Sequence, residues 1–261
     1  MHRLLSTLVV TAGLAVAGPA LADRSDAVPS DVPAPIENAI ADPARGDAAA
    51  DDERRKPAAV LMCSQVEPGD TVIELIPGSG YWTAMLSDIV GKDGHVVAVL
   101  PTAVVEKHPD ALASIKKMAA EPGHANVEVM TVDADALSSI ETQPADLVFT
   151  AQNLHDFANK GMGTITPKAF ATEIKPLLAD DGVLLVNDHA ATRGTGLAHT
   201  SDLHRIDPAL VKKQIVAAGY RFDGASDALA NPDDSHKIKV FDEPIKGHTD
   251  EFIYRFVPTS D

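Results

Sequence analysis

The chain has 261 residues, of which 22 are Lys or Arg and 38 are Asp or Glu, so its formal net charge is −16. This excess of acid disfavours binding to nucleic acids and to anionic membrane surfaces, both of which attract clustered Lys and Arg. The aromatic content of 4% argues against a stacking platform for single strands, and the single cysteine, Cys63, excludes an intrachain disulfide and a cysteine-rich metal site.

Residues 1–22 have the three-part pattern of a cleavable secretory signal peptide. A basic start with Arg3 is followed by an apolar stretch over Leu4–Ala17, then by Pro19 and the small-residue exit A-L-A. The alternative is a membrane anchor, because the uncharged run of about 20 residues approaches spanning length. Pro19 and the small exit residues favour cleavage after Ala22, so we expect a periplasmic or secreted chain without a stable membrane anchor.

The rest of the chain is expected to form an extended N-terminal arm over 23–50, with a short helix near Pro35–Ala41, and one domain over 51–261. The arm is rich in Ala, Asp and Pro, whereas strand and helix patterns alternate after it. Such alternation is typical of βαβ units and predicts an α/β fold with a mostly parallel sheet. Strands are expected at 71–75, 95–100, 126–132, 145–150, 182–188, 220–226 and 251–257, and helices at 51–64, 81–90, 103–120, 166–178 and 208–218.

A glycine-rich loop, I-P-G-S-G, separates the first expected strand from the helix that follows it. Glycines in such a loop let the backbone approach a ligand at a helix N-terminus. Nicotinamide enzymes use G-x-G-x-x-G/A, and Thr83 at the third small position disfavours that alternative. An acidic residue at the strand end followed by G-x-G fits better, as Glu74, Gly78 and Gly80 show.

Four stretches together resemble the class I S-adenosylmethionine-dependent methyltransferases, and most closely a bacterial group that carries a signal peptide. They are R-R-K-P-A-A-V-L, E-L-I-P-G-S-G-Y-W-T, A-D-L-V-F-T-A-Q-N-L-H-D-F and L-A-D-D-G-V-L-L-V-N-D-H. The resemblance extends from about Asp51 to Pro258. It implies a Rossmann-like methyltransferase fold, with a mostly parallel seven-stranded sheet, helices on both faces and an antiparallel C-terminal strand. It also implies S-adenosylmethionine as the cofactor and methyl transfer to an acceptor that we expect to be a small molecule.

The resemblance also implies roles for individual residues. An acid at the first strand end would order the loop near the cofactor's amino group, and the glycines would pass under its methionine part. By position, the cofactor-binding residues are Glu74, Ile76, Gly78, Gly80, Tyr81, Thr83, Asp133, Ala134 and Asn153. Two positions depart from the family pattern: Ile76 replaces the first glycine, and Leu100 stands where an acid usually binds the ribose. Glu106, in the next helix, is an alternative partner for the ribose.

Candidate bases are expected at the carboxyl ends of the strands, where open α/β sheets bind their ligands. His155 follows the fourth expected strand, and Asp188 and His189 follow the fifth. These three residues are the predicted catalytic residues, since histidine exchanges protons near neutral pH. The alternative is that these residues only fix their loops through hydrogen bonds.

Several polar residues after the fifth strand are of the types that bind metal ions. Asp188, His189, His199, Asp202 and His204 lie within 17 residues of one another. Their spacing matches no helix-borne pair of ligands, so no metal site is predicted.

Two hypotheses of function follow. The first is an S-adenosylmethionine-dependent methyltransferase. The second is an exported, non-catalytic protein that binds a small molecule on a degenerate methyltransferase scaffold, because Leu100 replaces the ribose acid and the cofactor is made in the cytoplasm. Arg54, Arg55 and Lys56 either gate the cofactor site or form a solvated helix face.

Overall fold

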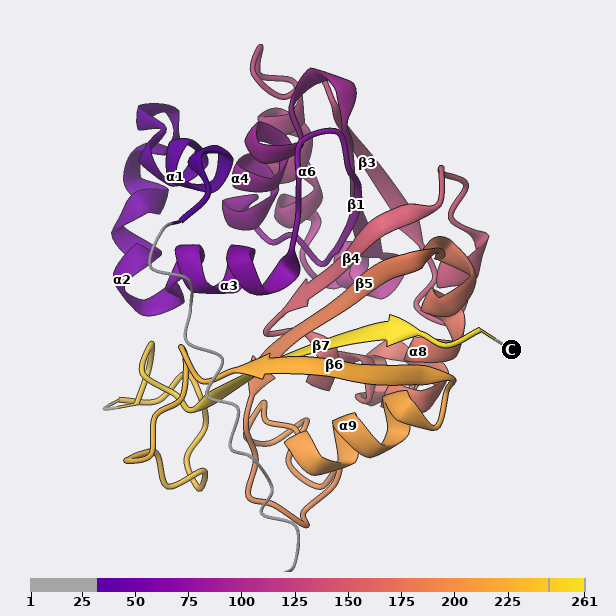
Figure 1. The fold of residues 1–261 in the computed structure, drawn as a ribbon. Helices are drawn as coiled ribbons and strands as arrows, with labels where there is room; N and C mark the ends of the chain where they lie inside the picture. The colour runs from indigo at the N-terminus through magenta and orange to yellow at the C-terminus, as the bar shows by residue number, and fades with distance from the viewer. Residues whose placement is uncertain (1–31, 244, 261) are drawn as a thin grey trace, which may run out of the picture.

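Seven strands form one sheet, with the order β3-β2-β1-β4-β5-β7-β6 (Figure 1). The computed structural model describes residues 32–243 and 245–260, so the expected signal peptide lies outside the described residues. The strands are β1 (Thr71–Leu75), β2 (His95–Pro101), β3 (Val127–Val132), β4 (Ala145–Ala151), β5 (Leu178–His189), β6 (Tyr220–Ser226) and β7 (Glu251–Pro258).

The sheet is parallel except for β7, which runs antiparallel to both β5 and β6. The central strands β1, β2 and β4 are apolar, rich in β-branched residues and mostly buried, as expected for strands covered on both faces, whereas the edge strand β3 is only partly buried. Val72 of β1, for example, lies between Val96 of β2 and Leu147 of β4. The predicted mostly parallel, seven-stranded sheet with an antiparallel C-terminal strand is therefore confirmed.

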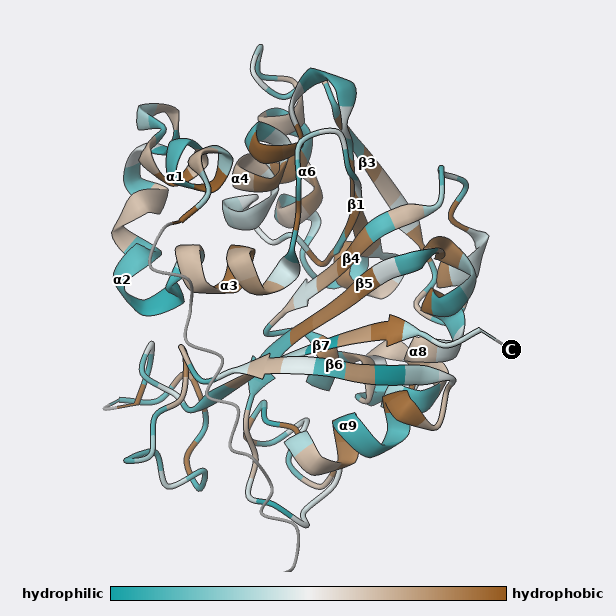
Figure 2. Ribbon diagram, in the orientation of Figure 1, coloured by the Kyte–Doolittle hydropathy of each residue, from teal (hydrophilic) through white to brown (hydrophobic). Residues whose placement is uncertain are grey.

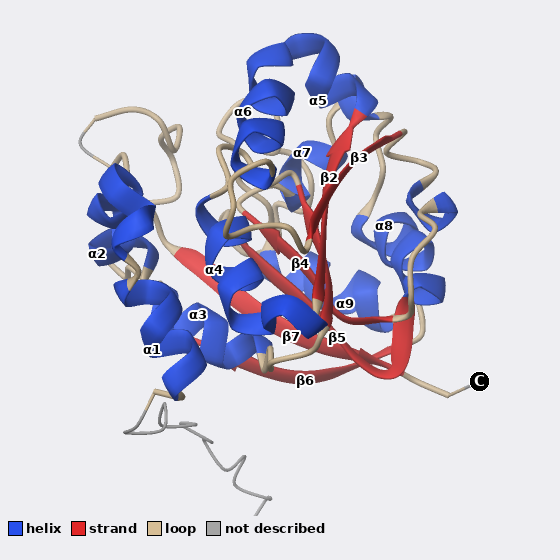
Figure 3. Cartoon of the chain, turned by 90° about the horizontal axis from the view of Figure 1, so that it is seen from above, coloured by secondary structure: helices blue, strands red, loops and turns tan. Residues whose placement is uncertain are grey.

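Helices cover both faces of the sheet (Figure 3). The α-helices of the described residues are α1 (Ala34–Ala41), α2 (Asp52–Arg55), α3 (Pro57–Ser64), α4 (Tyr81–Val90), α5 (Thr102–Lys107), α6 (Pro109–Ala119), α7 (Leu154–Phe157), α8 (Pro167–Ile174) and α9 (Pro208–Val216). Short 3₁₀ helices are η1 (Pro43–Asp51), η2 (Gly91–Asp93), η3 (Leu137–Ser139), η4 (Lys160–Met162) and η5 (Lys175–Leu177). Among the described residues, no helix combines the length and the apolar character needed to cross a membrane.

Alternating side chains of each strand point to the two faces and build two layers of core. Val72 and Val96 pack with Trp82 of α4 and with α1 and α3 on one face. Ile73 and Val97 pack with α8 and α9 on the other. Figure 2 accordingly shows hydrophobic residues along the strands and hydrophilic ones on exposed segments such as α2.

Prolines break two helices that the sequence pattern predicts as continuous. The residue before a proline is pushed away from the helical region, and this divides 51–64 at Lys56, where φ is 46°, and 103–120 at His108. The helix predicted over 166–178 is also shorter. It ends at Ile174, because Pro176 lies in η5 and β5 begins at Leu178.

The predicted extended arm instead contains two helices between residues 34 and 51. The short helix expected near its middle is present as α1, and η1 follows it after Asp42, which is extended. Ile36 and Ala39 of α1 are buried at 3% and 1% exposure in the same core layer as α4. These two buried side chains pack α1 against the domain. The composition of the arm, which is rich in Ala, Asp and Pro, gives no indication of this packing.

Replacing Ile36 with alanine tests this packing. The change empties a buried site, so we expect a loss of about 2–5 kcal/mol of unfolding free energy in urea titrations. Asn38→Ala, an exposed position in the same helix, is the matched control and should change stability by less than about 0.5 kcal/mol. Equal stability of the two variants would show that α1 is not part of the cooperative unit.

Candidate active site

A cavity of about 1070 Å³ opens where the strand order reverses, at the carboxyl ends of β1 and β4. After β1 the chain adds β2 and β3 on one side of the sheet, and β4 then pairs on the other side of β1. The loops that leave β1 and β4 therefore diverge and leave a crevice between them, which is the usual ligand site of an open α/β sheet. Its wall includes Gly78, Arg55, Asn153, His155 and His204.

The β1–α4 loop exposes its backbone to this cavity at Gly78. Gly78 has a φ of 60°, and a Cβ atom built there would meet nothing within 4 Å. Gly80, with a φ of 93°, instead faces α6, because a Cβ there would lie 3.2 Å from Ile115 Cδ1. The first glycine thus leaves room for a ligand, and the second permits close packing of the loop on a helix.

Backbone strain gathers around the same cavity. Ile76, Gln152, Thr164 and His204 all have positive φ angles between 55° and 62°, and all four line the cavity. A left-handed conformation costs a residue with a Cβ roughly 1–2 kcal/mol, and more hindrance arises when that residue is β-branched like Ile76. Such residues tend to cluster at functional sites.

Glu74 lies behind the glycine loop and joins β1 to α4. Its carboxylate accepts a hydrogen bond of 2.5 Å from the hydroxyl of Thr83, and both side chains are buried. Burial raises the pKa of Glu74 to about 7, against the opposing effects of Thr83 and Arg55. The loop therefore rests on a carboxyl group that is half protonated near neutral pH.

Arg55 presents a cation at the edge of the cavity. Its guanidinium carbon lies 4.6 Å from the ring centroid of Tyr81, whose hydroxyl donates a 2.7 Å hydrogen bond to Asp52. Burial, followed by the charge of Arg54, lowers the pKa of Arg55, although a guanidinium stays charged in proteins. Both arginines pair with Asp51, Arg54 at 2.6 Å and Arg55 through Nε at 3.5 Å. Of the three basic residues of this segment, Arg55 lines the cavity, whereas Arg54 and Lys56 are exposed and do not line it.

Asn153 joins the two strand ends that bound the cavity. Its Nδ2 donates to the carbonyl oxygens of Ile76, at 3.2 Å, and Ala151, at 2.6 Å. The side-chain amide is therefore hydrogen-bonded to the backbone, and it holds the loop after β4 against the loop after β1.

His155 and Asp188 form a buried pair at the opposite wall. The backbone N–H of His155 donates to Asp188 Oδ2 at 2.7 Å, and its Nδ1 lies 2.8 Å from Oδ1. Burial lowers the pKa of His155, but the carboxylate of Asp188 outweighs this and leaves it above its ordinary value. Burial by itself would raise the pKa of Asp188, but the charge and hydrogen bond of His155 lower it by more, so the pKa lies below its ordinary value. Because the carboxylate accepts at Nδ1, the other ring nitrogen, Nε2, faces the cavity.

His189 lines the cavity but is held as a neutral ring. Its Nδ1 lies 2.8 Å from the hydroxyl of Thr249 and 3.4 Å from a carboxylate oxygen of Glu251. Burial lowers the pKa of His189 to about 3. Burial also raises the pKa of Glu251, which accepts hydrogen bonds from Gln152 and Asn187. His189 therefore shapes the wall in its neutral form.

The loop between β5 and α9 is fixed by Arg205, a fully buried cation. Its guanidinium pairs with Asp234 at 2.8 Å, both side chains being 0% exposed, and donates to the carbonyl oxygen of Ala190 at 3.0 Å. This anchors the neighbouring His204 at the cavity wall.

The structure brings together most of the predicted site residues. Those lining the cavity are Ile76, Gly78, Tyr81, Asn153, His155 and His189. Glu74, Gly80, Thr83 and Asp188 lie behind these and support them. Asp133 is exposed and Ala134 belongs to the core, and neither lines the cavity.

The ribose position remains without an acid. Leu100 is 0% exposed and packs with Ile115, whereas Glu106 is exposed and lies outside the cavity lining. Lys107 and His108 line this side instead. Lys107 and His108 were not predicted from the sequence, although their position just after the second strand indicated that they could lie at this site.

The buried carboxyl of Glu74 predicts how stability depends on pH. An ordinary glutamate has a pKa near 4.3, so between that value and about 7 the folded chain holds a proton that the unfolded chain has lost. This contribution to stability is present at low pH and is lost as the pH rises to 7. As the pH rises from 5 to 8, the unfolding free energy of Glu74→Gln should increase by roughly 3 kcal/mol relative to that of the parent in urea titrations. Parallel pH profiles for the two proteins would contradict this assignment.

Comparison with known proteins agrees with this architecture. Residues 66–230, more than half of the chain, match the family model described as a methyltransferase domain. A protein-L-isoaspartate O-methyltransferase of Methanococcus maripaludis is 29% identical over 136 residues, which are 51% of this chain and 55% of that protein. The corresponding enzyme of Methanococcus aeolicus is 31% identical over 101 residues, 38% of this chain and 44% of that protein. The chain thus spans about half the length of these curated relatives.

Solved structures show the same fold at low identity. A SAM-dependent methyltransferase from Aquifex aeolicus has a TM-score of 0.54 at 18% identity, covering 85% of this chain and 96% of that one. Aeropyrum pernix fibrillarin, solved with natively bound S-adenosyl-L-methionine, has a TM-score of 0.51 at 14% identity, covering 79% and 76%. By its sequence and its sheet topology, the chain belongs to the methyltransferase-domain family and has the fold of the class I S-adenosylmethionine-dependent methyltransferases.

Proposed function

We propose that this protein transfers the methyl group of S-adenosylmethionine to a small-molecule acceptor. The observation that carries the proposal is a single cavity with two unlike walls. One wall has the open glycine backbone and the Arg55 cation, and the other has the His155–Asp188 pair. The first suits a cofactor with an amino-acid end, and the second suits the nucleophile that receives the methyl group.

The residues at the first wall fit the methionine half of the cofactor. Arg55 offers a desolvated positive charge for its carboxylate. Gly78 leaves the loop backbone open to the cavity. Among the described residues, the indole Nε1 of Trp82 is a buried donor without a hydrogen-bond partner, and Trp82 lines the same cavity. When bound, the cofactor supplies an electrophilic methyl group on a sulfonium.

The size of the cavity supports a small acceptor beside the cofactor. Sites for one small molecule usually measure about 300–1,000 Å³, and this cavity of about 1070 Å³ slightly exceeds that range. The archaeal relatives are named for a protein substrate, so an isoaspartyl peptide is the alternative acceptor to compare with small alcohols, acids and amines.

The chain's own contribution at the second wall is to position and deprotonate the acceptor. In-line transfer needs an acceptor lone pair aimed at the methyl carbon, and most of the benefit comes from holding it there. Asp188 fixes the ring of His155 so that Nε2 points to the cavity. The rival hypothesis of a non-catalytic binding protein rests on Leu100 and on the expected export away from the cytoplasm, where the cofactor is made, and the family match gives it no support.

Arg55→Ala tests the cofactor site. Loss of a charged hydrogen-bonding partner should weaken S-adenosylmethionine binding about 10- to 100-fold in calorimetric titrations. Arg54→Ala is the matched control, because it removes the neighbouring charge outside the cavity and should leave affinity within about twofold. Absence of binding to the parent protein at millimolar cofactor would overturn the proposed function.

Asp188→Asn tests the second wall. An amide in place of the carboxylate removes the acceptor that orients His155, so turnover of radiolabelled methyl groups should fall about 100-fold or more. The affinity for the cofactor should stay near that of the parent, since Asp188 does not line the cavity. Equal losses of cofactor binding and turnover would instead indicate a general disturbance of the fold.

A further inference from the structure

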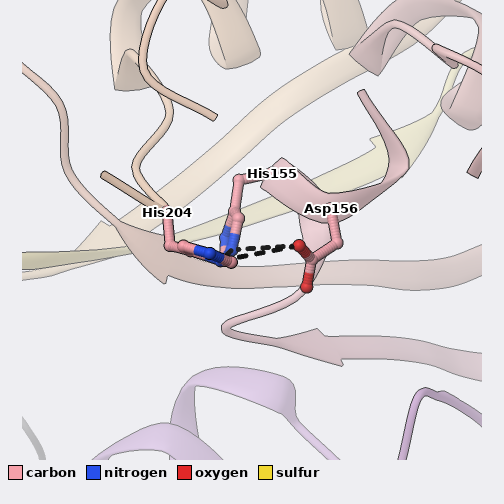
Figure 4. Close-up of side chains that lie close together, drawn as sticks. All are labelled: His155, Asp156 and His204. Carbon is pink, nitrogen blue, oxygen red and sulfur yellow. Dashed lines mark hydrogen bonds and ion pairs between the residues drawn. The ribbon is translucent and has the colours of Figure 1, made fainter. Parts of the chain in front are cut away.

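Two histidines and one aspartate converge at the second wall of the cavity (Figure 4). His155 and Asp156 are neighbours in α7, and His204 comes from the loop between β5 and α9. His155 Nε2 lies 3.2 Å from His204 Nδ1 and 3.4 Å from Asp156 Oδ1, and the last two atoms are 3.7 Å apart. Three potential ligand atoms thus form a nearly equilateral triangle.

The triangle has the dimensions of one face of a metal coordination sphere. A tetrahedral ion with bonds of about 2.0–2.1 Å to nitrogen and oxygen keeps its ligand atoms about 3.4 Å apart. The three separations lie on either side of that value. We propose that His155, Asp156 and His204 bind a divalent transition-metal ion such as Zn²⁺. This departs from the sequence analysis, which predicted no metal site and did not group these three residues.

The surroundings of His155 are those of a metal ligand. Metal-bound histidines almost always donate their second ring N–H to a carboxylate or carbonyl, which fixes the ring and frees the first nitrogen for the ion. Asp188 accepts at Nδ1 of His155 and leaves Nε2 in the triangle. Asp156 Oδ1 accepts a 3.2 Å hydrogen bond from Asn159 Nδ2, which orients the carboxylate.

His204 is also held in place before any ion binds. Its φ of 55° is strained, and the buried Arg205–Asp234 pair adjoins it. Its ring meets that of His155 edge-on at 5.3 Å between centroids and lies 4.9 Å from the ring of Phe241. Strain that the surrounding structure maintains at a polar cluster is typical of a preformed site.

A proton is the competing explanation for the cluster. One proton shared by His155 and His204 accounts for their 3.2 Å contact. It does not account for Asp156 Oδ1, which lies 3.4 and 3.7 Å from the two rings, whereas charge-assisted hydrogen bonds measure about 2.7–2.9 Å. A cation bound against this triangle attracts all three atoms at once.

The ion would face the methyl acceptor, and this part of the inference rests on the proposed function. With Nε2 bound to the ion, His155 holds the ion in place, and the ion takes over from the ring the activation of the acceptor. All three ligands line the cavity, and three protein ligands with a further position open to substrate are typical of catalytic zinc. The open position suits an oxygen acceptor, whose hydroxyl proton is lost more readily beside a cation. The oxygen gains the methyl carbon, the carbon–sulfur bond breaks with its electron pair left on sulfur, and the hydroxyl proton passes to water.

Metal titration of the full chain tests the site. The protein is purified without a histidine tag, stripped with chelator, and titrated with Zn²⁺ by calorimetry and with Co²⁺ by visible absorption. We expect one equivalent of either ion to bind and the Co²⁺ spectrum to be that of a four- or five-coordinate ion. His204→Ala and Asp156→Asn should each weaken binding at least 10-fold, and Asp188→Asn about 10- to 100-fold.

The matched control is His199→Ala, which removes a half-buried histidine of the same loop that pairs with Asp202 at 3.2 Å and does not line the cavity. It should leave metal affinity unchanged. The inference is overturned if no stoichiometric ion binds, or if His204→Ala binds as tightly as the parent. Arg55→Ala should bind the ion normally. If the parent protein binds the metal but not the cofactor, the proposed methyl transfer is rejected and the metal site is retained. If it binds the cofactor but not the metal, only the metal site is rejected.

Discussion

The site depends on one buried charge, the carboxylate of Asp188. It has no exposure, and it accepts three hydrogen bonds, from the backbone and the ring of His155 and from the backbone of His189. A carboxylate without such partners would cost several kcal/mol to bury. The hydrogen bonds from these donors join the start of α7 to the end of β5, and they also orient His155 toward the cavity. The same carboxylate therefore stabilises the fold and orients the side chain of the second wall.

The architecture was largely predictable because its causes are local. Apolar runs such as T-V-I-E-L predict buried strands, and their alternation with helices predicts a parallel sheet. Errors arose where a single residue overrides periodicity, as Pro57 and Pro109 do in breaking two helices. They also arose at α1, whose few apolar side chains gain their importance only from the helix against which they pack.

The candidate site was predictable only in part. Strand ends identify Glu74, His155 and Asp188, because motif and topology place them at one edge of the sheet. His204 could not be assigned from its neighbours in sequence, since its position depends on the ion pair of Arg205 with Asp234, 29 residues further along the chain. Long-range partners are the information that the local pattern lacks.

The four cavity residues with positive φ angles have a consequence for selectivity. Their conformational cost is met when the chain folds, by the stability of the whole domain, and not when a ligand arrives. A molecule that enters therefore loses little affinity to the ordering of these backbone segments. Backbone held in such conformations adapts less readily to a poorly matched ligand, because the loops after β1 and β4 would have to be rebuilt. We therefore expect a cavity of this kind to discriminate by shape and to favour compact ligands over flexible ones.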